Sequence, residues 1–216
     1  PAFRSPLTSI RGYVQAMVDG VIPPESQQKY LDIILFETDR LTKLTSNLLD
    51  VNNFDKDNIF LDISRFNLHD SIRKTAGALE GVAAKKDIHF DLELSDTEPL
   101  WVSGDKDKIQ QVLHNLMDNA VKFSHEGSSI LISTREKGNR VFVSVKDSGI
   151  GIPKDDLGKI FERFYKTDLS RGKDKLGTGL GLSICKEIIT AHKQNLDVVS
   201  TEGVGSEFVF TLTKET

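Results

Sequence analysis

The first fifty residues contain two stretches in which apolar residues recur at alternating spacings of four and three. The first stretch has five such positions: Phe3, Leu7, Ile10, Val14 and Met17. This spacing is typical of a helix that packs against other helices. A second stretch repeats the pattern between Tyr30 and Val51, after a break at residues 19–24. The pattern predicts a helical hairpin over residues 1 to about 55, and pairing of two hairpins into a dimeric four-helix bundle would cover the apolar stripe that each leaves exposed.

A polar stretch at residues 52–58 ends this pattern, and helices and strands are mixed after it. The periodicity predicts helices at 68–84, 105–123 and 180–192, and strands at 88–94, 130–134, 141–145, 196–200 and 207–212. Several of these strands are joined by short turns, which favours an α+β sandwich with helices over one face of a mixed sheet. We expect this second domain to extend over residues 56–216.

The charge of the chain argues against nucleic-acid binding. It has 28 lysine and arginine residues against 32 aspartate and glutamate residues, and a net charge of −4, whereas a protein that holds a nucleic-acid backbone normally has clustered positive charge. The single cysteine, Cys185, can form no internal disulfide, and its apolar neighbours favour a buried structural thiol over a reactive one. No run approaches the ~18 apolar residues of a membrane span, so we expect the given piece to be soluble. Because it begins abruptly inside a predicted helix, we expect it to be a fragment of a longer protein.

Three polar residues of the predicted helix at 105–123 share one face. Asn115, Asn119 and Lys122 are separated by four and three residues, which places two amides and an ammonium group in one row. An amide oxygen can bind a hard cation such as Mg²⁺, and a lysine can bind phosphate. The row therefore indicates either a metal and phosphate site or a solvated polar face.

The predicted strand at 141–145 leads into the sequence DSGIGIP at residues 147–153. Because glycine has no Cβ atom, Gly149 and Gly151 would let a flat ligand approach the backbone closely. The carboxylate of Asp147 is suited to accept a hydrogen bond from an exocyclic amine. The alternative is an ordinary Asp-Gly turn after a strand.

A glycine-rich turn at residues 177–182 opens the predicted helix at 180–192. The unpaired N–H groups at the start of a helix form an anion site that suits phosphate. The turn lacks the Gly-Lys-Ser/Thr of a P-loop and does not follow a strand, as a dinucleotide fingerprint requires. The polar segment 167–176 precedes it and contains Arg171, so this segment is either a surface loop or a lid that closes on a polyphosphate.

The polar row, the Asp-Gly turn and the glycine-rich turn follow one another along the chain, and this combination closely resembles the sensor histidine kinases. That family belongs to an ATPase superfamily that also includes gyrase, the Hsp90 chaperones and the MutL repair proteins. Residues 115–123 resemble the N box, 147–152 the G1 box, 161–164 the F box, 177–182 the G2 box and 203–206 a weaker final glycine box. The resemblance implies a histidine kinase/Hsp90-like sandwich that binds ATP and Mg²⁺.

The resemblance also implies roles for individual residues. Asn119 would hold Mg²⁺, Asn115 and Lys122 would contact the phosphates or the metal shell, and Asp147 would receive the adenine amino group. Lys166 stands where the family often has arginine. An arginine guanidinium can donate two parallel hydrogen bonds to a phosphate, whereas the lysine ammonium offers a single point charge. The other nucleotide-binding positions would be Phe123, Gly149, Gly151, Ile152, Phe164, Arg171, Gly177, Thr178, Gly179, Leu180 and Gly181.

Two departures from the relatives concern Asn115 and residues 192–194. The chaperone and gyrase relatives carry a glutamate at the place of Asn115 to activate water, and an amide cannot act as that base. We therefore expect the phosphoryl group to pass to a side chain rather than to water, with Asn115 and Lys122 in the catalytic set. At the end of the last predicted helix, residues 192–194 (HKQ) replace the usual Gly-Gly, which we expect to alter only a helix cap.

The hairpin resembles the dimerisation and phosphoacceptor module of the family, whose H box usually reads His-Glu-Leu/Phe-Arg-Thr/Ser-Pro-Leu. Residues 3–7 (FRSPL) match it, but Pro1 and Ala2 stand where the family has the nucleophilic histidine and its acidic neighbour. Truncation, deliberate substitution and natural degeneracy each explain this gap, and we favour the first two. In each case the chain should bind ATP and fail to phosphorylate itself. Ser5 occupies a position that helps to hydrolyse phosphoryl-aspartate in the family, which leaves phosphatase activity open.

The resemblance thus implies the cytoplasmic catalytic fragment of a two-component sensor histidine kinase, attached to an inner membrane only through segments outside this sequence. In the parent protein, the γ-phosphate of ATP would pass to a histidine at the position of Pro1. It would then pass to an aspartate on the receiver domain of a response regulator docked on the hairpin. The rivals are a phosphatase-only or ATP-hydrolysing relative and a non-enzymatic, nucleotide-binding dimeric scaffold.

Overall fold

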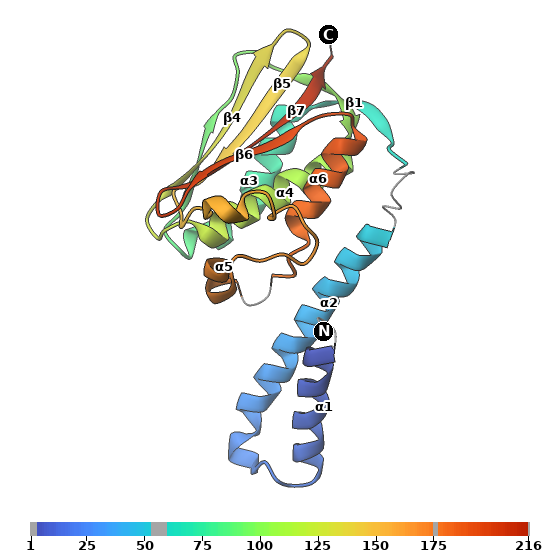
Figure 1. The fold of residues 1–216 in the computed structure, drawn as a ribbon, viewed down its shortest axis with the longest axis vertical. Coiled ribbons are helices and arrows are strands. Elements are labelled where there is room, and N and C mark those ends of the chain that lie inside the picture. The colour runs from blue at the N-terminus through green and yellow to red at the C-terminus, as the bar shows by residue number, and fades with distance from the viewer. Residues whose placement is uncertain (1–3, 53–59, 175–176, 216) are drawn as a thin grey trace. The chain divides into compact units, whose positions relative to one another are not determined.

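The computed structural model describes residues 4–52, 60–174 and 177–215, apart from the side chains of residues 43, 46–52, 171 and 173. The chain forms two compact units, a helical hairpin and a larger α/β unit, and each is described by itself (Figure 1). The predicted domain boundary near residue 55 lies outside the described residues. Within the described ranges, no helix combines the length and the apolar character that crossing a membrane requires.

The first unit is a helical hairpin, as predicted. It consists of α1 (Arg4–Val18), a short 3-10 helix η1 (Pro24–Ser26) and α2 (Gln27–Asn52). The two helices contact each other through the rings of Tyr13 and Tyr30, whose centroids lie 5.2 Å apart. Phe3, the first position of the predicted seam, lies outside the described residues. Several large apolar side chains of the described hairpin remain exposed in the single chain, among them Leu7, Val14, Leu31 and Leu35.

The second unit is built on one mixed sheet. Its strands are β1 (Ile63–Asn67), β2 (His89–Glu93), β3 (Trp101–Asp105), β4 (Ser129–Lys137), β5 (Arg140–Lys146), β6 (Leu196–Thr201) and β7 (Gly205–Lys214). The order across the sheet is β1-β3-β7-β5-β4-β2, and β6 also pairs with β7. β2 runs parallel to β4, and the other pairs are antiparallel. All predicted strands are present; β1 and β3 were not predicted.

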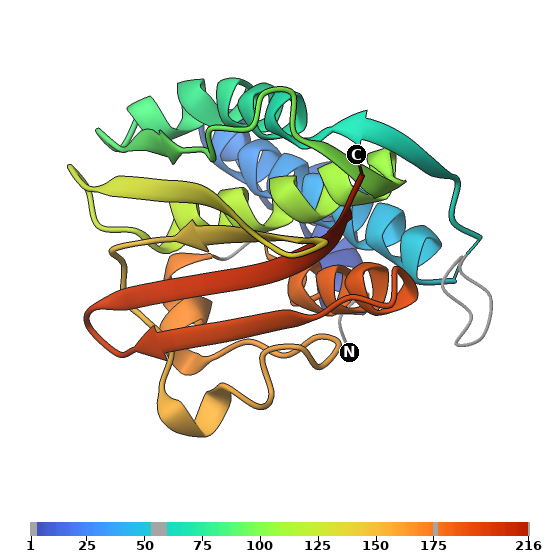
Figure 2. The ribbon, with the colours of Figure 1, turned by 90° about the horizontal axis from the view of Figure 1, so that it is seen from above.

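Helices cover one face of this sheet (Figures 1 and 2). They are α3 (Leu68–Ala84), α4 (Lys106–Phe123) and α6 (Gly181–Ala191), and two shorter helices, η2 (Lys154–Asp156) and α5 (Asp168–Lys173), lie in the connection between β5 and α6. The core between the layers is apolar, and its fully buried side chains include Ile72, Leu113, Met117, Ile130, Ile132, Ile184 and Phe210. This arrangement is the α+β sandwich that the sequence predicted.

The polar segment that was predicted to be a surface loop or a lid contains a short helix in its described part. Its middle part forms the helix α5, whose first turn is capped by Thr167: the hydroxyl of Thr167 accepts a hydrogen bond from the Ser170 N–H across 3.1 Å. A threonine in this position satisfies an N–H group that the helix itself leaves unpaired. The sequence did not predict this helix because its six residues are too few to show a repeating apolar pattern.

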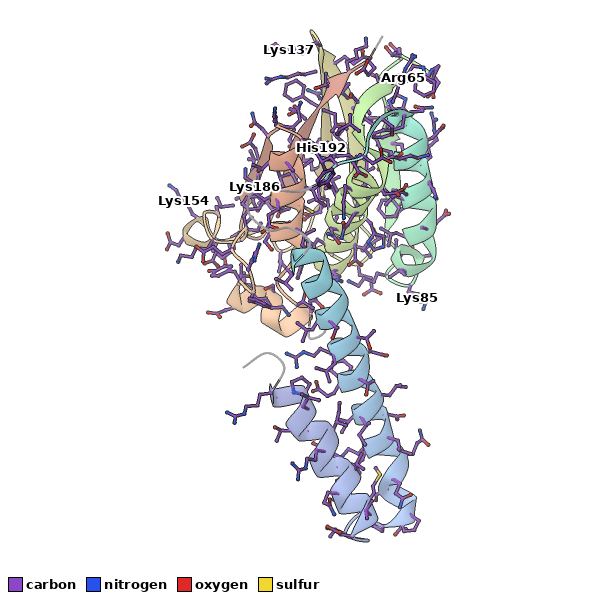
Figure 3. The ribbon with its side chains drawn as sticks, turned by 90° about the vertical axis from the view of Figure 1, so that its right-hand side faces the viewer. Arg65, Lys85, Lys137, Lys154, Lys186 and His192 are labelled. Carbon is purple, nitrogen blue, oxygen red and sulfur yellow. The ribbon has the colours of Figure 1, made fainter. Side chains whose placement is uncertain are left out.

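His192 does more than the predicted change of a helix cap. Its backbone ends α6, as expected, but its imidazole also reaches the first residues of α4, and Figure 3 labels the side chain. The Nε2 atom accepts a hydrogen bond from the Asp105 N–H across 2.9 Å. Asp105 in turn caps α4, because its carboxylate accepts the N–H groups of Asp107 and Lys108 at 3.1 Å. The end of α6 is therefore tied to the start of α4.

The prediction of a buried, structural cysteine is confirmed. Cys185 lies on α6 with none of its surface exposed, and it is a free thiol. Burial raises its pKa to about 12, so the thiolate that would be needed for reactivity is strongly disfavoured.

Candidate functional site

The polar row predicted on α4 is present and lies at one border of the helix layer. Asn115, Asn119 and Lys122 are all half-buried, whereas Leu116 and Ala120 between them are buried in the core. The amide nitrogen of Asn115 donates to the Gly181 carbonyl across 3.5 Å, which connects the row to the first residue of α6. Two of the predicted boxes are thereby neighbours in space.

Lys122 is engaged by acidic groups. Its Nζ atom lies 2.6 Å from a carboxylate oxygen of Asp118, one turn earlier on α4, and 3.7 Å from a carboxylate oxygen of Asp174. Asp174 directly follows α5, and its carbonyl accepts a hydrogen bond from the Lys166 ammonium across 2.7 Å. The amide of Asn119, in contrast, makes no hydrogen bond within the part of the chain that the structure describes. It is thus the member of the row that is free to bind a ligand.

Asp147 lies just beyond the end of β5 and is the most deeply buried acid of the site, with 7% of its surface exposed. Its Oδ1 atom accepts the Gly149 N–H at 3.0 Å and the Ser206 N–H at 3.3 Å. Burial raises its pKa to about 6, although these two hydrogen bonds and the nearby His125 act in the opposite direction. Because Oδ1 is used by the backbone, Oδ2 is left to meet a ligand.

Glycine is required at two places around this carboxylate. A Cβ atom at Gly149 would overlap the carbonyl oxygen of Phe123, and one at Gly205 would overlap the carbonyl oxygen of Asp147 itself. Gly205 also has a φ of 140°, which L residues rarely adopt. These close approaches join the end of α4, the turn after β5 and the start of β7 into one structure.

The turn after β5 is held against the end of α4 by the backbone. Ser124 and Gly149 form an isolated antiparallel bridge, in which the Ile150 N–H donates to the Phe123 carbonyl across 3.2 Å. Further along the turn, Gly151 has a φ of 65°, and the Ile152 N–H donates to the Ser200 hydroxyl across 2.8 Å. Phe123 and Gly149 are therefore brought together, close to Asp147, whereas Gly151 and Ile152 lie against the end of β6. Their roles in nucleotide binding stay predictions.

The predicted aromatic and glycine-rich elements also meet. The Phe164 N–H donates to the Gly179 carbonyl across 2.9 Å, and both residues have positive φ values, 66° and 72°. Phe164 is a non-glycine residue in a strained backbone conformation, and about half of its surface is exposed. Leu180 is fully buried and precedes α6, so it anchors the glycine-rich turn in the core.

The structure leaves several predicted site residues untested. Pro1 and the side chain of Arg171 lie outside the described part of the chain. Gly177 and Thr178 are described in the stretch before α6. Ser5 is exposed on α1 in the other unit. The roles of these residues stay predictions.

The sequence did not predict the contacts of three polar residues in this region. Ser206 supplies the second N–H to Asp147, while Asp118 and Asp174 contact Lys122. The spacing of Asp118 and Lys122 by four residues on a helix was a readable signal for an ion pair. Ser206 and Asp174 are far from their partners in the sequence, and no local pattern predicts such contacts.

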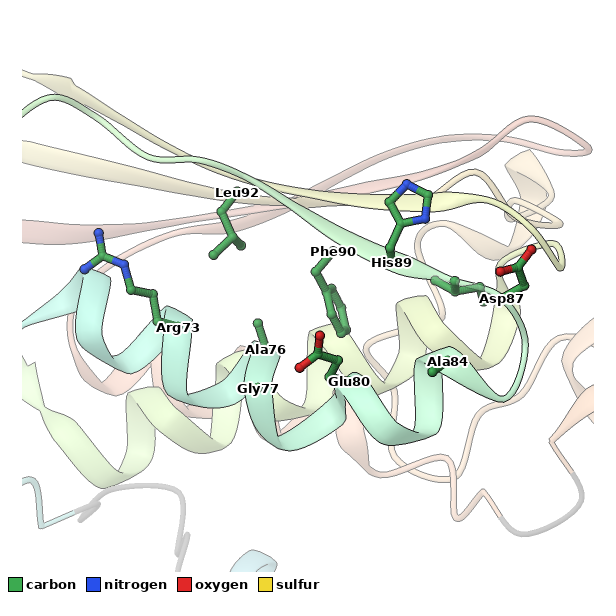
Figure 4. Close-up of a pocket in the computed structure, with 10 residues that line it drawn as sticks. Arg73, Ala76, Gly77, Glu80, Ala84, Asp87, His89, Phe90 and Leu92 are labelled. Carbon is green, nitrogen blue, oxygen red and sulfur yellow. The ribbon is translucent and has the colours of Figure 1, made fainter.

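A separate cavity lies elsewhere in the same unit. It has a volume of about 480 Å³ and opens between α3 and the edge strand β2 (Figure 4). Its walls include Ala76, Gly77, Phe90 and Leu92. None of the predicted site residues lines it, so it is distinct from the site around Asp147.

Comparison with known families agrees with this geometry. Residues 104–216 match the family described as histidine kinase-, DNA gyrase B- and HSP90-like ATPase, and residues 2–56 match the His kinase A (phospho-acceptor) domain. The chain is a sensor histidine kinase by family. The two matches follow each other in the order that the resemblance of the sequence implied. Every element that contributes to the site, from α4 to β7, falls within the ATPase match.

Individual sensor histidine kinases are similar over nearly the whole chain. The sensor histidine kinase WalK of Bacillus subtilis is 37% identical over 97% of this chain, which corresponds to 34% of WalK. The chain thus spans about a third of the length of the curated relatives it matches.

Solved structures of sensor histidine kinases also share the fold. Histidine kinase ThkA, solved in complex with the response regulator protein TrrA, superimposes with a TM-score of 0.79 at 32% identity, over 99% of this chain and 59% of that one. Full-length ShkA, solved in complex with AMPPNP, superimposes with a TM-score of 0.75 at 26% identity, over 99% of this chain and 44% of that one.

Proposed function

We propose that this chain is the catalytic region of a sensor histidine kinase that binds ATP around Asp147 and uses it to phosphorylate a histidine. The proposal rests on the burial and the hydrogen bonds of Asp147. It is a buried carboxylate with one oxygen fixed by two backbone N–H groups and the other oxygen free for a ligand. A buried acceptor of this kind is matched by a donor such as the exocyclic amine of adenine.

The phosphates would extend from this carboxylate along the polar row of α4. Lys122 supplies positive charge, and the turn that opens α6 supplies N–H groups at a helix start. Asn115 and Asn119 offer amide oxygens of the kind that Mg²⁺ accepts, and Mg²⁺ usually takes few protein ligands besides phosphates. Among the described residues, no cluster of three acidic, histidine or cysteine side chains forms a metal site. Asn119 would therefore be a protein ligand to a Mg²⁺ ion that is bound mainly by the phosphates of the nucleotide. Mg²⁺ would neutralise charge on the transferred phosphoryl group.

The acceptor of the phosphoryl group would be a histidine at the position of Pro1, from which it passes to a response regulator. ThkA has been solved with its response regulator TrrA, and this chain shares its fold over both units. Because Pro1 and Ala2 replace the histidine and its acidic neighbour, we infer that the chain binds ATP without phosphorylating itself.

The hairpin would pair with a second copy of itself. Leu7, Val14, Leu31 and Leu35 are exposed in the single chain and would be buried in a four-helix bundle. The curated relatives are about three times longer than this chain, which supports a larger protein in which these two units form the cytoplasmic part of an inner-membrane sensor.

The proposed nucleotide site is tested by titration calorimetry with AMPPNP and Mg²⁺. We expect Asp147→Asn to weaken AMPPNP binding about tenfold or more, because the substitution removes the charged carboxylate that would accept a hydrogen bond from the adenine amino group. Asp155→Asn removes the same charge from an exposed position on η2 and serves as the control. Binding that is equal in the wild type and in Asp147→Asn would refute the site.

The reaction is tested by placing histidine and glutamate at positions 1 and 2 and following the label from ATP carrying a radioactive γ-phosphate. Acid-labile, base-stable label on the protein, which moves to an added receiver domain, is the expected result. Release of free phosphate alone would identify an ATP-hydrolysing relative. Binding without either product would identify a nucleotide-binding scaffold.

A further inference from the structure

The last turn of α4 carries two residues of the proposed nucleotide site, Lys122 and Phe123. A helix leaves its last four carbonyl groups without a partner inside the helix, and the last turn frays where nothing else donates to them. The donors that reach the end of α4 therefore determine how firmly Lys122 and Phe123 are held.

Two of these four carbonyl groups are matched by backbone donors. The Ala120 carbonyl accepts the Ser124 N–H across 2.9 Å, at the cap of the helix. The Phe123 carbonyl accepts the Ile150 N–H across 3.2 Å, and Ile150 belongs to the turn after β5 that follows Asp147. These bonds satisfy the first and the last of the four groups.

One side chain satisfies the two carbonyl groups between them. The ammonium group of Lys86 donates to the backbone carbonyls of Val121 and Lys122, across 2.8 and 2.9 Å. A cation is favoured at the C-terminal end of a helix, where the carbonyl groups carry partial negative charge, and charged hydrogen bonds are stronger than neutral ones. Lys86 is also half-buried, so water screens this contact less than it would on an exposed surface.

The backbone of Lys86 is itself fixed. Lys86 lies just after α3, where its N–H donates to the Ala83 carbonyl across 2.9 Å and its carbonyl accepts the Gly127 N–H across 3.1 Å. The next residue, Asp87, has a φ of 54°, and the N–H of the buried Ile88 returns to the Ala83 carbonyl across 3.0 Å. This closed turn ends α3 and gives the Lys86 side chain a defined starting point.

We propose that Lys86 is a positioning residue of the nucleotide site. It acts through the end of α4, which it holds in the conformation that presents Lys122 and Phe123 to ATP. The inference rests on the proposed ATP site and adds to it a residue that lies outside all of its motifs. Without the Lys86 ammonium, the last turn of α4 is ordered in only a fraction of the nucleotide-free molecules, and the apparent affinity falls by that fraction.

The test compares wild type and Lys86→Met, which keeps a long side chain but removes the charge and the donors. We expect Lys86→Met to bind ADP with Mg²⁺ about fivefold to tenfold more weakly in titration calorimetry. Hydrogen exchange of the nucleotide-free chain, followed by NMR, should be faster at the N–H groups of Ser124 and Ile150, and saturating ADP should restore their protection. Lys86→Arg keeps the charge and the donors, so its ADP affinity should stay within about twofold of the wild type.

Two variants serve as controls. Lys85→Met removes the same charge from the exposed neighbouring residue, which Figure 3 labels, and should change neither ADP affinity nor exchange at α4. Ser144→Ala removes a buried hydroxyl that donates to Glu207 across 2.6 Å. It should lower the thermal midpoint and leave ADP affinity unchanged, which separates positioning from general loss of stability.

Three results would overturn the proposal for Lys86. They are unchanged ADP affinity in Lys86→Met, an equal loss in Lys85→Met, and a loss of affinity without faster exchange at the end of α4. If Lys86→Met does not fold, Lys86→Gln takes its place, because its amide can still donate to one carbonyl. Failure of the wild type to bind ADP is a different result: it would refute the ATP site, whereas unchanged exchange at α4 would refute the role of Lys86 alone.

Discussion

His192 accepts the N–H of Asp105 through its Nε2 atom across 2.9 Å, and its Nδ1 atom lies 2.8 Å from the carbonyl of Ile188. A backbone N–H can only donate and a carbonyl can only accept, so the proton of the neutral ring is on Nδ1. We predict that His192→Ala lowers the free energy of unfolding by about 1–3 kcal/mol, because it leaves a half-buried N–H unsatisfied at the cap of α4. Urea denaturation measures this difference.

His114→Ala is the control for this substitution. His114 is exposed on α4, the helix whose first turn His192 supports. Equal stabilities of the two variants would show that the bond from Asp105 contributes nothing.

The fold was predictable from the sequence where an element has its own apolar period. The helices at 68–84 and 105–123 were found because several turns repeat the same spacing. β1 and β3 were missed because neither of their sequences, ISRFN and WVSGD, alternates between apolar and polar residues. Their places in the sheet depend on pairing with each other, and β3 also pairs with β7, which no local pattern reveals.

The site was predictable as far as each motif is continuous in the chain. The turn after β5 could be assigned from Asp147 and its glycines, and the row on α4 from its helical spacing. The contacts that complete the site cross large sequence separations. Ser206 reaches Asp147 over 59 residues, and His192 reaches Asp105 over 87 residues. Only the three-dimensional structure shows these.

The raised pKa of Asp147 predicts how its replacement changes stability with pH. The folded-state pKa of about 6 lies above the ordinary value of 3.8 because burial disfavours the charged form. The protonated carboxyl is therefore favoured in the folded state at low pH, and this stability is lost as the pH rises through about 6. Asp147→Asn should equal the wild type near pH 3.8 and exceed it in unfolding free energy by up to about 3 kcal/mol above pH 7.

This dependence is measured by urea denaturation of both proteins between pH 4 and pH 8. Asp155→Asn, at an exposed position, should show no such trend. A constant difference between wild type and Asp147→Asn at all pH values would mean that the carboxylate is not destabilised by burial.

Gly149→Ala should damage both the stability of the unit and the nucleotide site. The added methyl group would overlap the Phe123 carbonyl, so the turn after β5 has to move away from α4. We expect a loss of about 1–3 kcal/mol in unfolding free energy, the usual effect of overpacking, together with weaker AMPPNP binding. Gly158→Ala is the control, since nothing lies within 4 Å of a Cβ atom there. Wild-type behaviour of Gly149→Ala would show that the close approach is not required.

The contact between Lys122 and Asp174 predicts competition with the nucleotide. Asp174 places a carboxylate oxygen 3.7 Å from the Lys122 ammonium, which is the group proposed to meet the phosphates. Phosphates that bind Lys122 have to displace or outweigh this carboxylate. Asp174→Asn should therefore bind ADP about twofold to fivefold more tightly at low salt, in line with the modest energy of a partly exposed ion pair.

Salt and a charge-matched variant separate this local effect from a general one. Raising the ionic strength screens the pair, so the advantage of Asp174→Asn should shrink as salt is added. Asp155→Asn changes the net charge equally without touching Lys122, and it should leave ADP affinity unchanged. An equal gain in both variants would mean that net charge, and not the contact between Asp174 and Lys122, controls binding. Weaker binding in Asp174→Asn would assign the carboxylate a supporting role in the site.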